Sequence, residues 1–205
     1  MYQVNFNNPV HIYFIGIGGI SMSGLAEILL NENFTVSGSD MKESDLTTLL
    51  SERGATIFYG QRYENITDDI DVVVYTSAIK EDNPERVRAN ELGIPTIERG
   101  NFLGEITKLF KDTIGIAGTH GKTTTSTMLA HLFTHSKSGC NAFLGGISKN
   151  YHTNLLLSKN PVLVAEADEF DRSFLQLFPD VAVITSTDAD HLDIYGDVCS
   201  IKAAF

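Results

Sequence analysis

The segment from Asp112 to Ser126 (DTIGIAGTHGKTTTS) constrains the fold of this 205-residue chain more than any other stretch. A short apolar run, Ile114 to Ala117, predicts a buried strand, and the glycine-bearing turn after it leads into a long helical pattern. Backbone N–H groups in such a loop and at the start of such a helix can bind an anion, and a lysine there can reach phosphate groups. The segment therefore predicts a phosphate-binding loop.

The loop differs from the usual pattern G-x-x-x-x-G-K-[ST] at one position. Ile116 stands where the first glycine belongs, and Gly115 lies one place too early. Lys122 is expected to contact terminal phosphates, and Thr123 a magnesium ion. The residues predicted to bind the nucleotide are Gly118, Thr119, His120, Gly121, Lys122, Thr123 and Thr124. The alternative is a glycine-rich turn followed by a surface lysine.

The composition, with 42% hydrophobic and 20% charged residues, is that of an ordinary globular protein. The formal net charge of -11 argues against nucleic acid or an anionic membrane as the main partner. Cys140 and Cys199 lack metal-ligand spacing. One possible pair of cysteines is no disulfide framework, which favours a reducing compartment. No signal peptide or membrane-spanning window is evident, so we expect a cytoplasmic location.

A second glycine loop lies near the N-terminus, within Val10 to Gly24 (VHIYFIGIGGISMSG). An apolar strand precedes a tight turn at Gly16, Gly18 and Gly19, and a helix is expected from Ser21 to Asn31. The loop resembles the dinucleotide fingerprint G-x-G-x-x-G, but Ser21 takes the third glycine position. Alone, this pattern indicates only a nucleotide-binding type of fold.

Two polar residues follow predicted strands of the N-terminal half. Asp40 ends the strand Phe34 to Ser39, 24 residues after Gly16, where an acidic residue can bind a ribose hydroxyl or simply cap a turn. Ser77 follows the strand Asp71 to Tyr75, where it can contact a ligand or lie in a solvated turn. The sequence leaves both alternatives open.

Strands recur at helix-length intervals, which predicts an α/β fold with parallel sheets. Because two glycine loops about 100 residues apart do not fit easily into one sheet, we expect two units. Residues 1–110 are predicted to form a Rossmann-like, doubly wound parallel sheet, and residues 111–205 the truncated N-terminal part of a P-loop ATPase domain. Within the second unit, residues 135–154 form a long polar stretch that predicts either a binding loop or a mobile surface loop.

Acidic clusters follow two apolar runs of the second half. Pro161 to Ala165 leads into Glu166, and Val181 to Ser186 leads into a segment that contains His191. In isolation each cluster is typical of a solvated turn. In the same sheet as a phosphate loop, however, the ends of these strands are where a nucleotide-bound magnesium ion is held. We therefore expect Glu166 and His191 to take part in the site.

Four segments together, GIGGISMSG, GTHGKTTT, EADEFDRSFL and DADHLDIYG, resemble the Mur ligases of peptidoglycan precursor synthesis. The resemblance runs from about His11 to Phe205 and is far more specific than either glycine loop alone. It implies a Rossmann-like domain for a UDP-sugar, a central ATPase domain, and a third domain that helps to hold ATP and the amino acid. Only the first and part of the second are present, so we expect a piece of a longer protein.

The resemblance also implies roles for individual residues. Gly16, Gly18 and Gly19 are expected to hold the UDP diphosphate, with Asp40 and Ser77 near the uridine. Ser21 is expected to be a further substrate-binding residue. Lys122 is expected to bind ATP phosphates, Thr123 and Glu166 one Mg²⁺, and His191 a second; Lys122, Glu166 and His191 form the expected catalytic set. His120 fills a motif position without chemistry of its own.

The implied reaction is ATP-driven joining of L-alanine to the lactyl carboxylate of UDP-N-acetylmuramate through an acyl phosphate. One alternative is the recycling ligase that adds a ready-made tripeptide to the same sugar nucleotide. A second alternative, from another class, is an NAD-binding oxidoreductase or sensor module. A third is that these residues alone only bind the UDP-sugar. Neither nucleic acid nor membrane insertion is expected, and the oligomeric state stays open.

Overall fold

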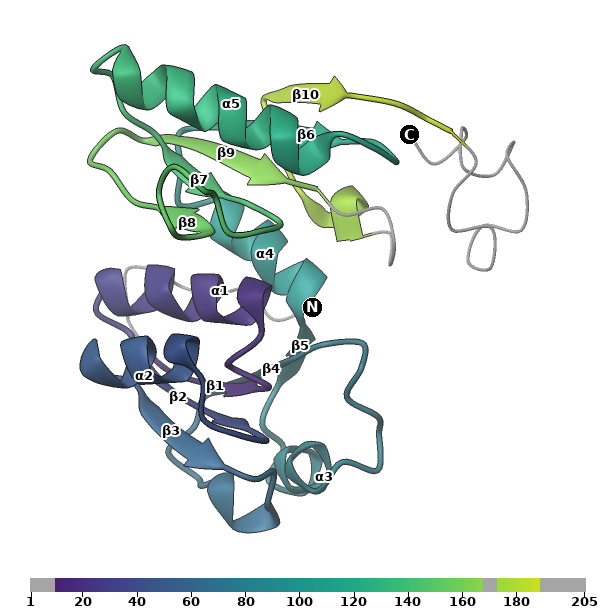
Figure 1. Cartoon of the computed structure of the whole chain (residues 1–205). Coiled ribbons are helices and arrows are strands. Elements are labelled where there is room, and N and C mark those ends of the chain that lie inside the picture. The colour runs from purple at the N-terminus through teal and green to yellow at the C-terminus, as the bar shows by residue number, and fades with distance from the viewer. Residues whose placement is uncertain (1–9, 168–172, 189–205) are drawn as a thin grey trace. The chain divides into compact units, whose positions relative to one another are not determined.

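The computed structural model describes residues 10–167 and 173–188. The chain forms two compact units, Met1–Phe102 and Leu103–Phe205, which are described separately below (Figure 1). The division falls inside a helix, whereas the sequence suggests it at residue 110. None of the helices in the described ranges is long and apolar enough to cross a lipid bilayer.

The first unit contains a five-stranded sheet in which every pair of neighbours is parallel. Its strands are β1 (His11–Ile15), β2 (Thr35–Asp40), β3 (Thr56–Tyr59), β4 (Val72–Tyr75) and β5 (Thr96–Glu98). The order β3-β2-β1-β4-β5 reverses direction between β1 and β4. In open parallel sheets a ligand binds beyond the carboxyl ends of the strands at such a reversal. The predicted doubly wound parallel sheet is confirmed.

Helices cover both faces of this sheet (Figure 1). They are α1 (Ile20–Asn31), α2 (Asp45–Glu52), α3 (Pro84–Glu91) and α4 (Arg99–Thr107), with a short 3-10 helix, η1 (Tyr63–Asn65). α1 and α2 pack against each other on one face, and α3 lies on the other. β5 is an edge strand, and Pro95, directly before it, has no N–H to offer a further neighbour.

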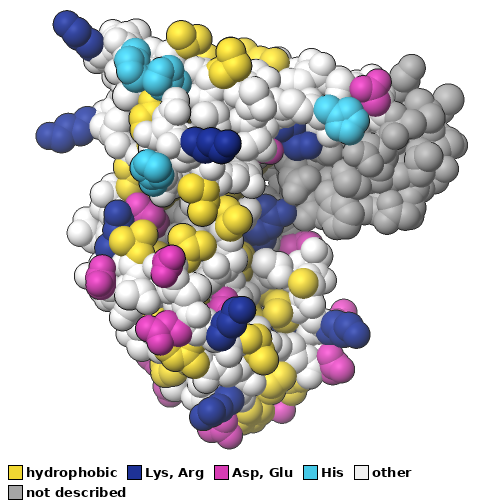
Figure 2. Space-filling view, viewed as in Figure 1, with side chains coloured by type: hydrophobic (Ala, Val, Ile, Leu, Met, Phe, Trp, Pro, Cys, Tyr) yellow, Lys and Arg dark blue, Asp and Glu magenta, His cyan; other side chains and the backbone are white. Residues whose placement is uncertain are grey.

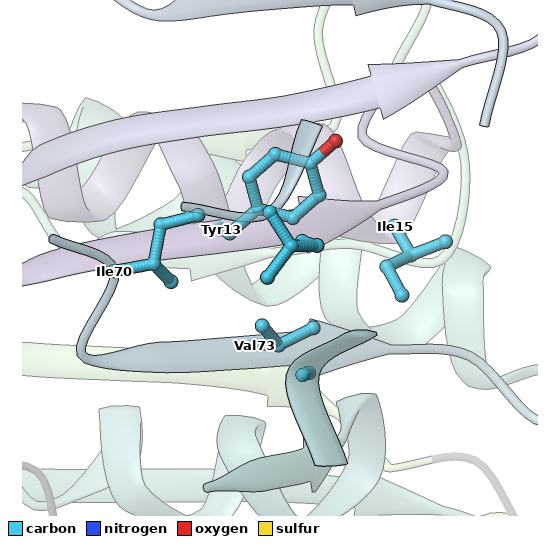
Figure 3. Packing of buried hydrophobic residues seen from close by; sticks show 6 residues of the cluster. Tyr13, Ile15, Ile70 and Val73 are labelled. Atoms are coloured by element: carbon cyan, nitrogen blue, oxygen red, sulfur yellow. The ribbon is translucent and has the colours of Figure 1, made fainter. Parts of the chain in front are cut away.

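The core of the first unit is built around β1, whose residues Ile12 to Ile15 are 0% exposed. Tyr13 and Ile15 point to the face covered by α3 and pack with Ile70 and Val73 (Figure 3). The strand is buried on both faces, which explains its unbroken apolar run. Polar residues alternate with apolar ones only in strands that expose one face to solvent. A rigid central strand fixes the glycine loop that follows it.

The second unit contains a sheet of order β10-β6-β9-β7-β8. Its strands are β6 (Asp112–Ala117), β7 (Asn141–Phe143), β8 (Leu155–Leu156), β9 (Val162–Glu166) and β10 (Val181–Ile184). All neighbours are parallel except β7 and β8. Helix α5 (Lys122–His135) covers one face. Beside the other lie Phe174, from a 3-10 helix, η2 (Ser173–Gln176), and Leu177, which follows that helix. β6 thus lies between β9 and β10, so all three strand ends meet at one edge.

The stretch 135–154, predicted to be a loop, contains the buried strand β7. Its middle residue, Ala142, is fully buried under α5 together with Cys140. Burial raises the pKa of the Cys140 thiol to about 11, so it stays neutral. Asn141 is tolerated in the core because its amide donates to the carbonyl of Asn160 at 2.6 Å and accepts from the N–H of Ser158 at 2.8 Å. The prediction of a loop is therefore wrong for this part.

Candidate functional site

The starts of α1, α2, α3 and α5 are of two kinds. Ser44 caps α2 in a capping box with Thr47, and Asn83 caps α3 by accepting from two N–H groups. Helices α1 and α5 begin after glycines, Gly19 and Gly121, and have no side-chain cap. The first N–H groups of a helix have no partner within it, and a ligand is one way to satisfy them. The uncapped starts of α1 and α5 both follow predicted binding loops.

The phosphate loop of the second unit runs from the end of β6 to the start of α5. Gly118 has a φ of 128° and Gly121 a φ of 83°, both in the region that favours glycine. These two residues turn the chain back so that Lys122 is the first residue of α5. The ammonium of Lys122 donates to the carbonyl oxygen of Gly118 at 2.7 Å, which holds it against the loop. The predicted strand, loop and helix all form.

Glu166, at the end of β9, lies directly beside this loop. Thr123 donates its hydroxyl to Glu166 Oε1 at 2.8 Å, and the Gly145 N–H donates to Oε2 at 2.8 Å. The parallel pairing of β6 with β9 brings these groups together, because both strands end at the same edge of the sheet. Two predicted site residues, 43 positions apart, are therefore in contact. Gly145 is a third member, which the sequence indicates only as part of the stretch 135–154, predicted to be a binding loop or a mobile surface loop.

Hard oxygen ligands of this kind fit a magnesium ion. Mg²⁺ is usually held by one or two protein oxygens, with phosphate oxygens and water completing its shell. Thr123 and Glu166 can supply such oxygens from one small region. Within residues 10–167 and 173–188, no three His, Cys, Asp or Glu side chains converge as a metal site would require. His191 lies outside the described residues.

The outgoing segment of β10 also contacts the phosphate loop. The N–H of Thr119 donates to the carbonyl of Ser186, and the N–H of His120 donates to Ser186 Oγ, both at 3.1 Å. These two N–H groups are thus held by the protein. The N–H groups from Gly121 onward, at the uncapped start of α5, are the candidates for binding an anion. Thr124, also predicted to take part, is exposed in the first turn of α5.

In the first unit, the N–H groups of the glycine loop have acceptors within the protein. Those of Gly16 and Ile17 donate to the carbonyl of Ser39, and that of Gly19 donates to the carbonyl of Gly16. The N–H of Gly18 donates to Asp40 Oδ2 at 2.8 Å. The carboxylate of Asp40 thus takes the place at Gly18 that a phosphate oxygen would take. A diphosphate that binds the Gly18 N–H therefore has to displace the Asp40 carboxylate from it.

The remaining predicted residues of this unit lie at the same edge of the sheet. Ser21 is half-buried in the first turn of α1, and Ser77 is exposed in the turn after β4. Asp40 ends β2. All three follow the carboxyl ends of β1, β4 or β2, next to the reversal in strand order.

Basic side chains are scattered singly over the face of the protein seen in Figure 2. A broad basic patch, which nucleic acids or anionic membranes require, does not appear on that face. With a net charge of -11, anion binding has to come from local loops and helix ends.

Sequence profiles identify the family. One described as "Mur ligase family, catalytic domain" matches residues 11–111, and one described as "Mur ligase middle domain" matches residues 116–205. The chain belongs to the Mur ligase family. The resemblance seen in the four sequence segments is thereby confirmed. The two matched Mur ligase regions contain the glycine loop and the phosphate loop, respectively.

Curated Mur ligases of bacteria resemble the chain over nearly its whole length. A UDP-N-acetylmuramate--L-alanine ligase of Agathobacter rectalis is 46% identical over 205 residues, which are 100% of this chain and 45% of the relative. The enzyme of the same name from Clostridium botulinum is 49% identical over 195 residues, or 95% of this chain and 42% of the relative. The chain thus spans about half the length of the curated relatives it matches.

Solved Mur ligase structures share the fold. The UDP-N-acetylmuramate:L-alanyl-gamma-D-glutamyl-meso-diaminopimelate ligase of Neisseria meningitides aligns with a TM-score of 0.87 at 31% identity, over 97% of this chain and 67% of that one. The UDP-N-acetylmuramate-alanine ligase MurC of Thermotoga maritima aligns with a TM-score of 0.85 at 35% identity, over 95% of this chain and 45% of that one.

Proposed function

We propose that this chain is the UDP-sugar-binding and ATP-binding part of a ligase that joins L-alanine to UDP-N-acetylmuramate. The observation that carries the proposal is the hydrogen bond between Thr123 and Glu166 beside Lys122, at an uncapped helix start. Relatives named for this activity are 44–49% identical to the chain, which supports the choice of substrates. A cytoplasmic location, where ATP is supplied, goes with this proposal.

The reaction needs stabilisation of negative charge in both of its steps. Phosphoryl transfer from ATP to the lactyl carboxylate gives an acyl phosphate and ADP. The amine of L-alanine then attacks the acyl carbon, loses a proton and displaces phosphate through a tetrahedral intermediate. Positioned cations and N–H groups lower such barriers because they face the developing charge without having to reorganise.

Lys122 and the start of α5 are the groups of this chain suited to that task. The Lys122 ammonium, now on the Gly118 carbonyl at 2.7 Å, has only to swing from the loop to reach a bound phosphate. The N–H groups at the start of α5 add the positive end of a 14-residue helix. Together they bind and orient the triphosphate.

Glu166 and Thr123 would hold magnesium. When bound, the ion would screen the charge of the phosphate oxygens. The N–H of Gly145 fixes the Glu166 carboxylate in the orientation that faces Thr123. A second ion at His191 is part of the same proposal.

The first unit, residues 1–110 by the predicted division, is proposed to bind the UDP moiety, with the second unit, 111–205, binding ATP. The diphosphate would lie at Gly18 and the start of α1, where it exchanges places with the Asp40 carboxylate. Ser21 and Ser77 would line the same edge. NAD is the competing ligand for such a loop. Titration of the protein with UDP-N-acetylmuramate and, separately, with NAD distinguishes between these two ligands.

The recycling ligase is the second candidate, because a solved ligase of that specificity has a TM-score of 0.87 to this chain. Its identity of 31% is lower than that of the alanine ligases, which favours L-alanine. The two are separated by offering the full-length protein L-alanine or the L-alanyl-gamma-D-glutamyl-meso-diaminopimelate tripeptide as the amine. Phosphate release with the tripeptide alone would reverse the assignment.

Lys122→Ala in the full-length protein is expected to lower the rate of ligation about 10³-fold or more, because a cation facing the transferred phosphoryl group is lost. Binding of UDP-N-acetylmuramate, measured by calorimetry, is expected to change less than about twofold, since independent sites contribute additively. Lys149→Ala, an exposed lysine of the same unit, is the matched control and is expected to keep full activity. Unchanged turnover in Lys122→Ala would refute the role of the loop.

A further inference from the structure

We propose that Thr185 and Ser186, just beyond β10, are positioning residues that hold the phosphate loop in its nucleotide-binding shape. We call this pair the hydroxyl clasp. The inference rests on the proposed function, because it assigns the loop to ATP. It adds two residues with no expected role in the sequence, and it explains why the loop needs glycine at position 118.

Ser186 binds the loop through both its backbone and its side chain. Its carbonyl accepts the Thr119 N–H, and its Oγ accepts the His120 N–H, at 3.1 Å in each case. The Ser186 and Thr119 hydroxyls are also 2.8 Å apart and share a hydrogen bond. Thr119 is only 6% exposed, so its hydroxyl depends on protein partners.

Thr185 binds the loop on either side of Gly118. Its hydroxyl lies 3.1 Å from the carbonyl of Ala117 and 2.5 Å from that of His120, and its one proton is shared between these acceptors. Its N–H donates to the Ala117 carbonyl at 2.9 Å. The Thr185 hydroxyl therefore ties together the entry and the exit of the tight turn.

Gly118 lies directly beneath the clasp. A Cβ at this position would be 2.2 Å from Thr185 Oγ1 and 2.8 Å from the backbone nitrogen of Ser186. Such distances are far inside van der Waals contact, so any side chain would push the clasp away from the loop. Glycine at position 118 is thus required by the clasp as well as by its φ of 128°.

The contacts continue from the clasp to the proposed catalytic lysine. Gly118, held under Thr185, offers the carbonyl oxygen that receives the Lys122 ammonium at 2.7 Å. On the other side, the Asp188 N–H donates to Thr119 Oγ1 at 3.0 Å, which ties the loop to the segment that leads toward His191. The clasp therefore holds the turn that carries the Gly118 carbonyl, and with it the position of the Lys122 ammonium.

The clasp hydroxyls add little to the sheet itself. β10 pairs with β6 from Val181 to Ile184, and the backbone bonds from the Thr185 N–H to the Ala117 carbonyl and from the Thr119 N–H to the Ser186 carbonyl extend this pairing without either hydroxyl. Beyond that ladder, the two hydroxyls contact the loop segment Ala117 to His120. Their removal is therefore expected to disturb nucleotide binding more than folding.

The test uses Ser186→Ala and Thr185→Val in the full-length protein, with steady-state kinetics for each substrate. Both variants are expected to raise the KM for Mg-ATP about tenfold, because each loses side-chain hydrogen bonds to the loop. The KM for UDP-N-acetylmuramate is expected to stay within about twofold. Thr187→Val, the neighbouring hydroxyl residue, is the matched control and is expected to behave as wild type. Ser186→Thr and Thr185→Ser restore a hydroxyl and are expected to recover most of the ATP affinity.

Hydrogen exchange gives a second readout that does not depend on turnover. The His120 amide, which donates to Ser186 Oγ, is expected to lose protection in Ser186→Ala and to keep it in Thr187→Val. ATP kinetics and amide protection equal to wild type in both clasp variants would overturn the clasp alone. Equal rises in the KM of every substrate, together with a lower Tm, would show that the clasp only stabilises the fold and does not position the loop for ATP. If the wild type itself fails to bind Mg-ATP, the proposed function fails first, and the clasp as an ATP-positioning device fails with it.

Discussion

Glu85 is a buried acidic residue in the first turn of a helix, a position where an acidic side chain is usually exposed. It follows Asn83-Pro84 in the first turn of α3, yet it is 0% exposed. Its carboxylate accepts from the Tyr13 hydroxyl at 2.7 Å, the Ser39 hydroxyl at 2.6 Å and the Asn65 amide at 2.7 Å. Burial, with the charge of Glu85 as a further cause, raises the pKa of Tyr13, which keeps this donor protonated. The network joins β1, β2, η1 and α3.

Replacement of Glu85 is expected to cost far more stability than its polar character suggests. Glu85→Ala leaves the buried Tyr13 and Ser39 hydroxyls without this acceptor and removes one of the two acceptors of the half-buried Asn65 amide. We expect a loss of about 3 kcal/mol or more in the free energy of unfolding. Glu85→Gln keeps the shape and one acceptor oxygen, so about 1 kcal/mol is expected. Urea unfolding measures both values, with Glu81→Ala, an exposed residue, as the control. Equal midpoints for Glu85→Ala and Glu81→Ala would show that the network contributes nothing.

At the scale of elements, the local sequence was enough to predict the structure wherever a strand, a glycine turn and a helix follow one another directly. The phosphate loop and the first glycine loop were predictable because their chemistry lies within some 15 consecutive residues each. β7 and β8, with three and two residues, are too short to give a periodic pattern and depend on their neighbours in the sheet. Their presence follows from the sheet, not from the segment itself.

The hydroxyl clasp was beyond prediction for a related reason. Ser186 and His120 are 66 positions apart, and they meet only because β10 is the neighbour of β6. Parallel order in a sheet is decided by long-range packing, which a single sequence does not display. Glu166 was accessible to sequence reasoning because an acidic residue past a strand end is itself a recognisable pattern. Ser77 was also noted for its place after a strand, but that pattern does not tell what Thr185 and Ser186 contact, which depends on the order of strands in the sheet.

The end of β7 offers a prediction about the element that supports Glu166. A Cβ on Gly145 would be 2.5 Å from Glu166 Oε1, whereas one on Gly146 would be 3.6 Å from the Thr123 methyl, an ordinary contact. Gly145→Ala is therefore expected to displace the carboxylate from Thr123 without unfolding the protein. The KM for Mg-ATP is expected to rise about tenfold, the effect of losing a hydrogen bond to a charged group.

Gly146→Ala is the matched control for that experiment and is expected to change the KM less than about twofold. A magnesium titration at fixed ATP distinguishes the cause, because a displaced Glu166 raises the magnesium requirement as well. Identical kinetics of the two alanine variants would mean that the placement of Glu166 does not matter for ATP use.

At the scale of the whole molecule, the two units carry separate binding loops. Each loop follows the first strand of its own sheet, β1 or β6, and each precedes a helix without a side-chain cap. The first unit has a hydrophobic core of its own around β1. We therefore expect its ligand binding to be a property of that unit, and ATP use to need the longer protein seen in the relatives, of which this chain spans about half.

Calorimetric titration of the 205-residue chain separates these expectations. UDP-N-acetylmuramate is expected to bind, NAD is expected to give no heat, and ligation with Mg-ATP and L-alanine is expected to be absent.

Asp40→Asn tests the glycine loop directly. The Asp40 carboxylate, which accepts the Gly18 N–H, carries a negative charge that repels a diphosphate, so removal of this charge is expected to tighten UDP-sugar binding. Asp45→Asn, an acidic residue in the first turn of α2, is the control and is expected to leave the affinity unchanged. Weaker binding in Asp40→Asn would instead make this carboxylate a direct contact of the sugar nucleotide, and binding of NAD in place of the UDP-sugar would overturn the assignment of the unit.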